Sequence, residues 1–517
     1  MGKTAAAALL CLLLAGQEPV DSEVNEKIRR EATENSRIMA VIHYLTDIVG
    51  ARLTGSPQHR QAAEWAVQQA SQWGLQNARL ETWNFGRAGW SNQRAIAVVT
   101  APFQETLVGR ALAWTPSTGG RITGWCLLLI PPAQPTQSEL TAWLEGQREA
   151  VRDRIVLPGR AAVVPVSFTP TPMRLDLDSP ASAAAERISK ADEADPILTA
   201  AQISAQIDAF LKEGGSLARL YDSARTLGQV RASQHSSYNP STTLPSLVLR
   251  NEDYGRLARV LEDGLAVEME LEIANTVHPE GRTSVNVIAE IPGSDRAGEV
   301  VMLGGHLDSM HGAGGATDNA SGVAVMMEAA RILAAIGAPP RRSIRLALWG
   351  GEEQGLLGSQ AYVQQRFGSA ESQRAEFSRL SAYFNLDSGT GRIRAFTVFG
   401  PQQAADTLSQ IVAPYRDLGV AGAQATRNRR LCCSDYTSFW VAGLPGITLV
   451  QDPIEYSATW HSNLDSYERI ALEDLQQAAM VTASAVYHLA MRDQLLPRFP
   501  TGQLPPPGTA GDAPAGR

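Results

Sequence analysis

Five residues of metal-binding type occur along the chain, each at the end of an apolar segment or at the start of a helical one. They are His306 in GGHLDS, Asp318 in ATDNASG, Glu353 in GGEEQGLLGS, Asp387 in FNLDSG and His461 in TWHSNLDS. Such ligands must be held on rigid elements, so the pattern favours a fold that gathers five distant segments. A catalytic zinc typically takes about three protein ligands and a water. Five ligands instead suit two ions, with one bridging carboxylate and two further ligands on each.

Each of these residues would be weak evidence by itself. An aspartate after a strand is usually a turn or capping residue, and Glu352 and Glu353 would suit an exposed helix start. The five motifs together, in this order, are what indicate a metal site.

With these motifs the chain resembles the di-zinc exopeptidases, a family that includes bacterial leucyl aminopeptidases, glutamate carboxypeptidase II and plasma glutamate carboxypeptidase. The likeness extends from about residue 25 to about residue 490 and is weakest from roughly 118 to 280. It is carried by YLTDIVGARLTGSP, NVIAEIPGSD, VVMLGGHLDS, GATDNASGVAVMMEAARIL, RRSIRLALWGGEEQGLLGS and HSNLD.

The resemblance implies two Zn²⁺ ions per chain. His306 and Asp387 would hold one ion, Glu353 and His461 would hold the other, and Asp318 would bridge both. Two ions about 3.5–4 Å apart can share a hydroxide and polarise the scissile carbonyl group.

The resemblance also implies catalytic roles for residues beside the ligands. Glu352 would be the general base that takes the proton of the attacking water, and Asp308 would orient His306. Tyr456 is the candidate donor to the oxyanion, and Tyr436 is the alternative. Some relatives have a tyrosine directly before the last histidine ligand, where this chain has Trp460.

The expected function is hydrolysis of dipeptides or short peptides by a metal-dependent exopeptidase. A single-zinc acyltransferase of the glutaminyl cyclase type and a non-catalytic, receptor-like binding protein are the alternatives. Retention of all five ligands argues against both. A carboxypeptidase or dipeptidase needs a cation for the substrate carboxylate, and the cluster of Arg427, Arg429 and Arg430 is a candidate. Dimerisation is common among the relatives, so a homodimer is among the expected assemblies.

Lys3 and the apolar run AAAALLCLLLAG predict a signal peptide over residues 1–20, and hence a secreted or periplasmic enzyme. This run is too short to span a membrane, and no other segment suggests a transmembrane helix. A net charge of −8 without a basic stripe argues against nucleic-acid binding. The neighbouring Cys432 and Cys433 are equally compatible with a disulfide and with two free thiols.

The predicted fold class is α/β, with a mixed, mostly parallel central sheet flanked by helices and an inserted β-rich, protease-associated lid domain. The catalytic domain is expected to combine residues 24–117 and 281–495. The insert would span residues 118–280, with short β-like runs such as AAVVPV and a mobile loop at 169–200. The Pro- and Gly-rich tail, residues 496–517, should be disordered.

Overall fold

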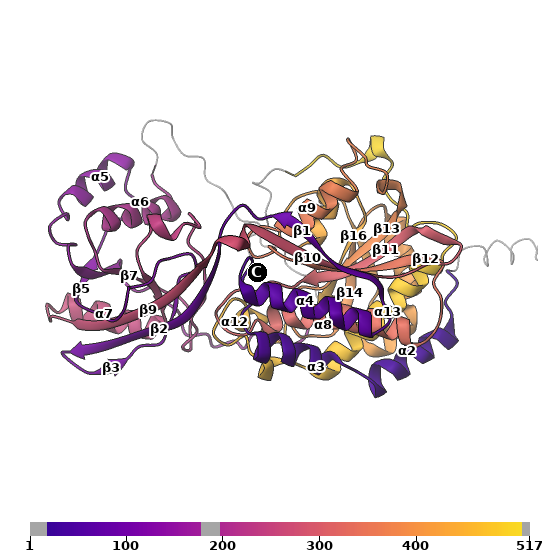
Figure 1. Cartoon of the computed structure of the whole chain (residues 1–517), viewed down its shortest axis with the longest axis horizontal. Coiled ribbons are helices and arrows are strands. Elements are labelled where there is room, and N and C mark those ends of the chain that lie inside the picture. Colours follow the sequence, from indigo (N-terminus) through magenta and orange to yellow (C-terminus); the bar gives the residue numbers. More distant parts are fainter. Residues whose placement is uncertain (1–17, 177–196, 509–517) are drawn as a thin grey trace, which may run out of the picture.

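The computed structural model describes residues 18–176 and 197–508, which form two parts lying side by side (Figure 1). The predicted leader lies almost entirely outside the described residues. Within them, no helix combines the length and the apolar character needed to cross a membrane.

The larger part is built on an eight-stranded mixed sheet whose central strands are parallel. In spatial order the strands are β1 (Gln76–Asn84), β10 (Thr283–Ile291), β12 (Arg342–Trp349), β11 (Arg296–His306), β13 (Leu380–Asn385), β16 (Gly446–Gln451), β14 (Ile393–Phe399) and β15 (Ala423–Thr426). The pairs β12–β11, β11–β13 and β13–β16 are parallel, whereas the edge strand β1 and its neighbour β10 run antiparallel. The predicted fold class is therefore confirmed for this part.

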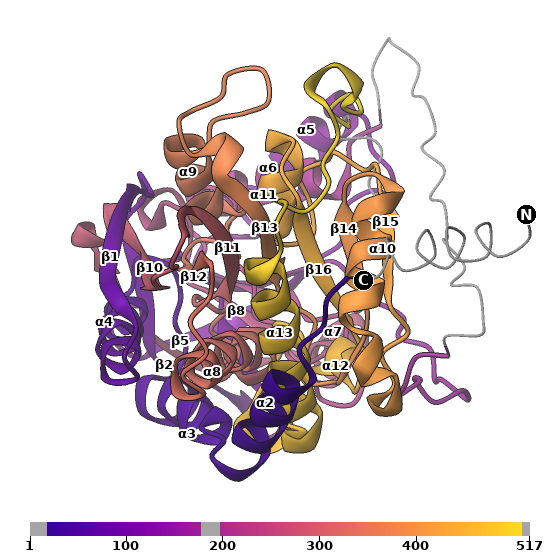
Figure 2. The same cartoon turned by 90° about the vertical axis from the view of Figure 1, so that its right-hand side faces the viewer.

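Helices cover both faces of this sheet (Figure 2). The helices of this part are α2 (Ser22–Glu34), α3 (Ile38–His43), α4 (Pro57–Gln72), α8 (Ser321–Ala335), α9 (Leu357–Arg366), α10 (Gln402–Ile411), α11 (Tyr436–Ala442), α12 (Tyr456–Thr459) and α13 (Leu472–Met491).

Alternate residues of the central strands supply two separate apolar cores. Val301 and Leu303 of β11 pack in the core that contains α8 and α13, while Val300 and Met302 pack on the opposite face with α9 and α11. Burial on both faces explains why these strands read as continuous apolar runs. It also explains why α8, which is buried from Ser321 to Leu333, has no solvent-facing polar stripe.

The smaller part contains a second eight-stranded sheet with three helices of its own. Its strands in spatial order are β3 (Glu105–Thr106), β2 (Gly89–Ala101), β9 (Glu268–His278), β5 (Ile122–Leu129), β6 (Arg154–Pro158), β7 (Ala218–Asp222), β8 (Ser246–Leu249) and β4 (Gly109–Ala111). Its helices are α5 (Gln137–Glu145), α6 (Ala200–Glu213) and α7 (Asn251–Glu262). The long antiparallel pair β2–β9 connects the two parts (Figure 1).

Three sequence-based expectations need correction. The insert begins near Gly89 rather than at residue 118, because β2 pairs with β9 along its whole length. The run at residues 161–166 forms no strand and exposes Val163 and Val166. Residues 496–508 are ordered rather than disordered, because Leu496 and Phe499 are buried.

The predicted mobile loop at 169–200 lies mostly outside the described residues. Residues 169–176 form no helix or strand. At their end, the Arg174 guanidinium pairs with Asp452 at 2.9 Å and also contacts Asp474, and the main-chain N–H of Leu175 donates to Asp452 at 2.8 Å. This end of the loop is therefore attached to the catalytic part.

We expect Leu346→Ala to lower the free energy of unfolding of the catalytic part by about 2–5 kcal/mol, because a buried leucine leaves a cavity when truncated. Leu346 is 1% exposed at the centre of β12. Chemical denaturation measures the change. The matched control is Leu265→Ala, at a side chain that is 54% exposed, with an expected change within about 0.5 kcal/mol. Equal effects of the two substitutions would contradict the assigned core.

Candidate metal centre

Three neighbouring parallel strands deliver most of the predicted ligands to one edge of the catalytic sheet. His306 is the last residue of β11, Glu352 and Glu353 follow β12, and Asp387 follows β13. The carboxyl ends of parallel strands meet at the same edge, where open α/β sheets build their sites. Asp318 lies just before α8, and His461 follows α12.

The structure brings all five predicted ligands into two overlapping groups. The first is His306, Asp318 and Asp387, and the second is Asp318, Glu353 and His461; in each group the ligand atoms lie within 4.8 Å of one another. Asp318 belongs to both groups, because its Oδ1 lies 3.2 Å from His306 Nε2 and its Oδ2 lies 3.2 Å from His461 Nε2.

Each histidine also contacts the second carboxylate of its own group. His306 Nε2 lies 3.0 Å from Asp387 Oδ1, and His461 Nε2 lies 2.7 Å from Glu353 Oε2. Burial alone would lower the pKa of both histidines. The nearby carboxylates outweigh it, with Asp387 first for His306 and Glu353 first for His461, so that the pKa of His461 rises to about 10.

These residues fit a pair of divalent cations. Asp318 Oδ2 is buried and accepts no hydrogen bond from the described residues, and such an atom is costly unless a cation or donor satisfies it. Imidazole nitrogen and carboxylate oxygen are the donor types that Zn²⁺ takes when cysteine is absent. Bound Zn²⁺ would replace the protons that now hold the histidines and carboxylates together.

The tautomer of His306 is set by a main-chain group. Its Nδ1 donates to the carbonyl oxygen of Asp308 at 2.9 Å, because a carbonyl can only accept. In the neutral imidazole that a metal ion would bind, Nε2 then carries the lone pair, and this nitrogen faces Asp318 and Asp387. The Asp308 carboxylate, which the sequence predicts as the partner of His306, is 3.6 Å from Nδ1.

The Asp308 carboxylate instead holds the turn that carries the two glutamates. It accepts from the main-chain N–H groups of Glu352 and Glu353, both at 3.3 Å, and from Thr54 Oγ1 at 2.7 Å. Asp308 therefore positions His306 through its main chain and the glutamate pair through its side chain.

Glu352 and Glu353 differ in their surroundings, as adjacent residues on a turn can. Glu353 contacts His461, and its Oε1 accepts from the main-chain N–H of Met310 at 3.1 Å. Burial raises the pKa of Glu352 well above its usual value; His306 opposes this rise, whereas Asp387 and Asp435 add to it. The Glu352 carboxyl group therefore lies within the electrostatic influence of His306 and Asp387.

Of the two candidate tyrosines, Tyr456 lies in the electrostatic field of the centre. Burial and then the carboxylates of Asp318, Asp387 and Glu353 raise its pKa, which favours the neutral phenol as a hydrogen-bond donor. Tyr436 packs its ring 4.7 Å from the ring of Trp440, in an apolar cluster with Phe399. The structure therefore favours Tyr456 over Tyr436.

Several residues that hold the candidate ligands in place were not predicted from the sequence. Asp465 accepts from the main-chain N–H and the hydroxyl of Thr317, at 2.5 and 2.8 Å, and from the main-chain N–H of Asp318 at 3.2 Å. Its place in the same HSNLD segment as His461 was the available signal. Asp435, buried beside the centre, has a pKa raised to about 7, chiefly by burial. Nothing in the local sequence CCSDY indicates that Asp435 lies beside the centre.

The segment before Asp435 is closed by a disulfide between the neighbouring Cys432 and Cys433, which resolves the two alternatives left by the sequence. The next residue, Ser434, accepts through its hydroxyl from Asn385 Nδ2 at 3.0 Å. The disulfide loop is therefore attached to the end of β13, two residues before Asp387.

Two arginines of the predicted cluster, Arg427 and Arg429, contact residues outside the candidate ligand set. Arg429 donates to Glu371 at 2.8 Å and to the carbonyl oxygens of Val441 and Pro505. Arg427 lies over the ring of Phe499 at 4.9 Å. Arg427 and Arg429 therefore contact the ordered C-terminal segment, whereas Nη1 and Nη2 of the buried Arg430 have no hydrogen-bond partner among the described residues.

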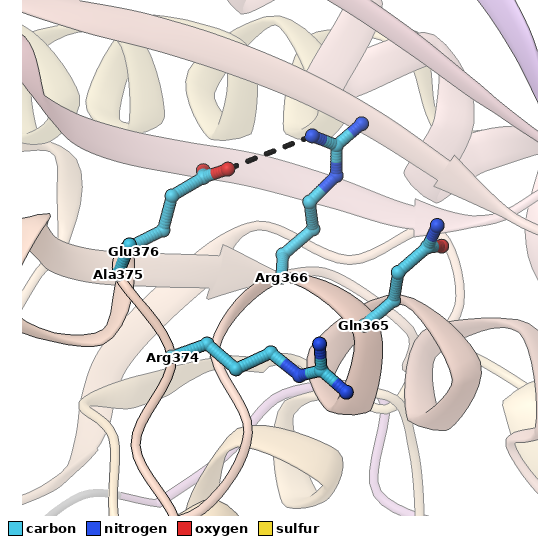
Figure 3. Close-up of a pocket in the computed structure, with 5 residues that line it drawn as sticks. All are labelled: Gln365, Arg366, Arg374, Ala375 and Glu376. Carbon is cyan, nitrogen blue, oxygen red and sulfur yellow. Dashed lines mark ion pairs between the residues drawn. The ribbon is translucent and has the colours of Figure 1, made fainter.

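A separate surface pocket lies at the end of α9, lined by Gln365, Arg366, Arg374, Ala375 and Glu376 (Figure 3). None of the five predicted ligands lines it. Arg366 pairs with Glu376 at 3.5 Å, as drawn in Figure 3, and with Glu81 at 2.7 Å. These ion pairs compensate the charge of Arg366, and none of the candidate metal-ligand groups among the described residues lies at this pocket.

Comparisons with known proteins agree with this geometry. Residues 286–486 match the family model "Peptidase family M28". The chain is 30% identical over 256 residues to carboxypeptidase Q of Mus musculus, covering 49% of this chain and 52% of that protein. It is 31% identical over 244 residues to aminopeptidase YwaD of Bacillus subtilis, covering 45% and 51%. The chain thus spans about half the length of the curated relatives it matches.

Solved structures show the same fold over most of the chain. A peptidase M28 precursor from Shewanella amazonensis superposes with a TM-score of 0.66 at 23% identity, covering 92% of this chain and 98% of that one. The zinc aminopeptidase BSAP from Bacillus subtilis superposes with a TM-score of 0.57 at 20% identity, covering 90% and 98%. The matched segment, residues 286–486, contains all five candidate ligands.

Proposed function

We propose that the chain is a secreted or periplasmic exopeptidase that hydrolyses dipeptides or short peptides with two Zn²⁺ ions. One ion would be held by His306 and Asp387, the other by Glu353 and His461, with Asp318 shared. The observation that supports this most directly is the position of Asp318, whose two oxygens face two different histidines, each paired with a second carboxylate.

When bound, the ions would supply Lewis-acid polarisation of the scissile carbonyl group and would acidify the attacking water. Glu352 carries the proton: it takes it from the attacking water and passes it to the nitrogen of the leaving amine. A raised pKa suits both transfers, because the carboxyl group must accept and then release a proton near neutral pH.

Tyr456 would donate its hydroxyl hydrogen to the carbonyl oxygen as negative charge develops there. The Asp308 carboxylate accepts hydrogen bonds from the main-chain N–H groups of Glu352 and Glu353. It would thereby fix the turn that carries the proposed base and the proposed ligand. The disulfide loop and Asp465 fix the segments that present Asp387 and Asp318.

We expect Glu352→Gln to lower kcat/KM for peptide hydrolysis by about 10²–10⁴-fold, because the amide cannot accept the water proton. The metal content should stay at two ions per chain, since Glu352 is not a proposed ligand. Hydrolysis of unblocked dipeptides and elemental analysis measure the two quantities. Glu145→Gln, at an exposed glutamate of α5, is the matched control. One bound ion and no peptide cleavage by the wild type would contradict the proposal and favour the glutaminyl cyclase type.

We expect removal of metal by EDTA to lower the melting temperature more at pH 8 than at pH 5. Without metal, the pKa values of Asp435 and Asp465 are raised to about 7, chiefly by burial, against about 4 in an unfolded chain. An acid whose pKa is higher in the folded state stabilises the fold fully below about pH 4 and loses that contribution as the pH rises through 7. Bound metal ions would offset the negative charge that develops on Asp435 and Asp465 as the pH rises. Melting curves at pH 5, 6, 7 and 8 test this, and a chelator effect that does not grow with pH would contradict it.

A further inference from the structure

Residues 230–234 of the second domain pair with the segment that carries the candidate ligand His461. The main-chain N–H of Ala232 donates to the carbonyl oxygen of His461 at 2.8 Å. The main-chain N–H of Asn463 donates to the carbonyl oxygen of Val230 at 3.0 Å, and the Asn463 Oδ1 accepts from the Val230 N–H at 2.7 Å. These hydrogen bonds join the two segments as a short antiparallel pair.

The same segment also contacts the main chain of a second candidate ligand. Gln234 donates through Nε2 to the carbonyl oxygen of Glu353 at 3.0 Å, and its Oε1 accepts from Gln354 Nε2 at 3.2 Å. Gln354 is only 7% exposed, so water has little access to this contact. Glu353 and His461 are the two residues proposed to hold one of the ions with Asp318. Both of them are therefore contacted from the second domain.

The contacting segment is itself firmly attached to the second domain. Val230 is fully buried and packs with Leu112 and Val248 in an apolar cluster of that domain. The main-chain N–H of Ala113 donates to the carbonyl oxygen of Ser233 at 3.0 Å. The segment is thus bonded to the second domain on one side and to the ligand-bearing segments on the other, so it can transmit the position of the domain to the ligands.

The backbone of His461 is in a conformation that needs support from its surroundings. Its φ is +56°, in the left-handed region that is unfavourable for a residue with a Cβ atom. Such a conformation persists only where neighbouring groups hold it. Within the catalytic domain, the main-chain N–H of Ser462 donates to the carbonyl oxygen of Thr459 at 2.9 Å. The bond from Ala232 adds a contact from the second domain directly to the carbonyl group of His461.

The ligands of the other proposed ion are positioned by the catalytic sheet. His306 ends β11, and its Nδ1 donates to the carbonyl oxygen of Asp308 at 2.9 Å. Asp387 follows β13, where the main-chain N–H of Leu386 donates to the carbonyl oxygen of Gly304 at 3.3 Å. These contacts join neighbouring strands of one sheet. The two proposed ions therefore differ in the support of their ligands, because one pair of ligands also depends on contacts between domains.

We propose that the second domain controls the affinity of one of the two ions, the one held by Glu353 and His461. Gln234 and Asn463 are positioning residues, which keep these two ligands in the geometry that an ion requires without contacting the ion. Outer contacts of this kind orient metal ligands and thereby set the affinity of the site. Loss of the contacts between the domains should weaken this ion and leave the other bound. The inference rests on the proposed function and adds to it the control of one metal site by domain contact.

The test measures how tightly each ion is held in the wild type and in Gln234→Ala. The full, zinc-loaded chain is dialysed against buffers of decreasing free Zn²⁺, and elemental analysis gives the metal bound per chain. The wild type should lose its ions with two dissociation constants. Gln234→Ala should raise one constant by about 10-fold, as expected for the loss of an outer contact to a metal ligand, and leave the other within about 2-fold. His461→Ala, which removes a ligand, identifies the step to which the raised constant belongs.

A second variant disrupts the same contact from the catalytic side. Asn463→Ala removes the oxygen that accepts from the Val230 N–H, and it should raise the same constant as Gln234→Ala. The matched control is Gln206→Ala. Gln206 is a half-buried glutamine of the second domain whose side chain donates to Gln137 Oε1 at 2.7 Å. It belongs to α6, which lies apart from α12 in Figures 1 and 2. The control should keep both constants of the wild type.

Three results would overturn the inference while leaving the proposed function intact. The first is that Gln234→Ala and Asn463→Ala keep both wild-type constants. The second is that both constants rise by the same factor, which indicates a general loosening of the fold. The third is a rise confined to the constant that survives in His461→Ala. A wild type that holds only one ion at every Zn²⁺ concentration would instead overturn the proposed two-ion function, and this inference with it.

Discussion

The mutual repulsion of buried carboxyl groups is the constraint on which the centre depends. Seven of them lie buried or half-buried at the edge of the catalytic sheet: Asp308, Asp318, Glu352, Glu353, Asp387, Asp435 and Asp465. The imidazoles of His306 and His461 contact several of these carboxyl groups, and the guanidinium of Arg52 acts through its charge on Asp465, Asp308 and Asp318. Arg52 is fully buried and donates to the carbonyl oxygens of Leu45, Gly50, Leu307, Gly314 and Gly315, so it holds the loops together. A site with this surplus of acid is suited to multivalent cations.

The second domain contacts the segments that carry the candidate metal ligands, in addition to its connection through β2 and β9. Its residues 230–234 hydrogen-bond to the segments that carry His461 and Glu353, and Arg174 reaches Asp452 of the catalytic part. Two ligand-bearing segments therefore depend on contacts from a domain that supplies no proposed ligand. The same contact surface brings residues 230–234 of the second domain to the rim of the centre.

Much of the catalytic half could be predicted because its evidence is local. The apolar run of β12 and the helical pattern of α8 are properties of short segments, and the ligands follow directly at the strand ends. The errors concern pairing between distant segments. Nothing in the sequence of β2 reveals that its partner is β9, which lies more than 150 residues away. Likewise, Phe499 is ordered because it packs on Phe399 at 5.3 Å, although its own segment is rich in proline and glycine.

The sequence by itself determined the metal-binding residue types, their order and the strands that carry them, because ligand chemistry and strand patterning depend on residue identity and short-range spacing. Only the tertiary structure decided which atom of Asp308 contacts His306, which tyrosine lies beside the carboxylates and which segment of the second domain contacts the ligand-bearing segments. These outcomes depend on the packing of two domains against each other. The role of a charged side chain depends on the groups that surround it in the folded protein. Those groups come from parts of the chain that no local sequence pattern connects.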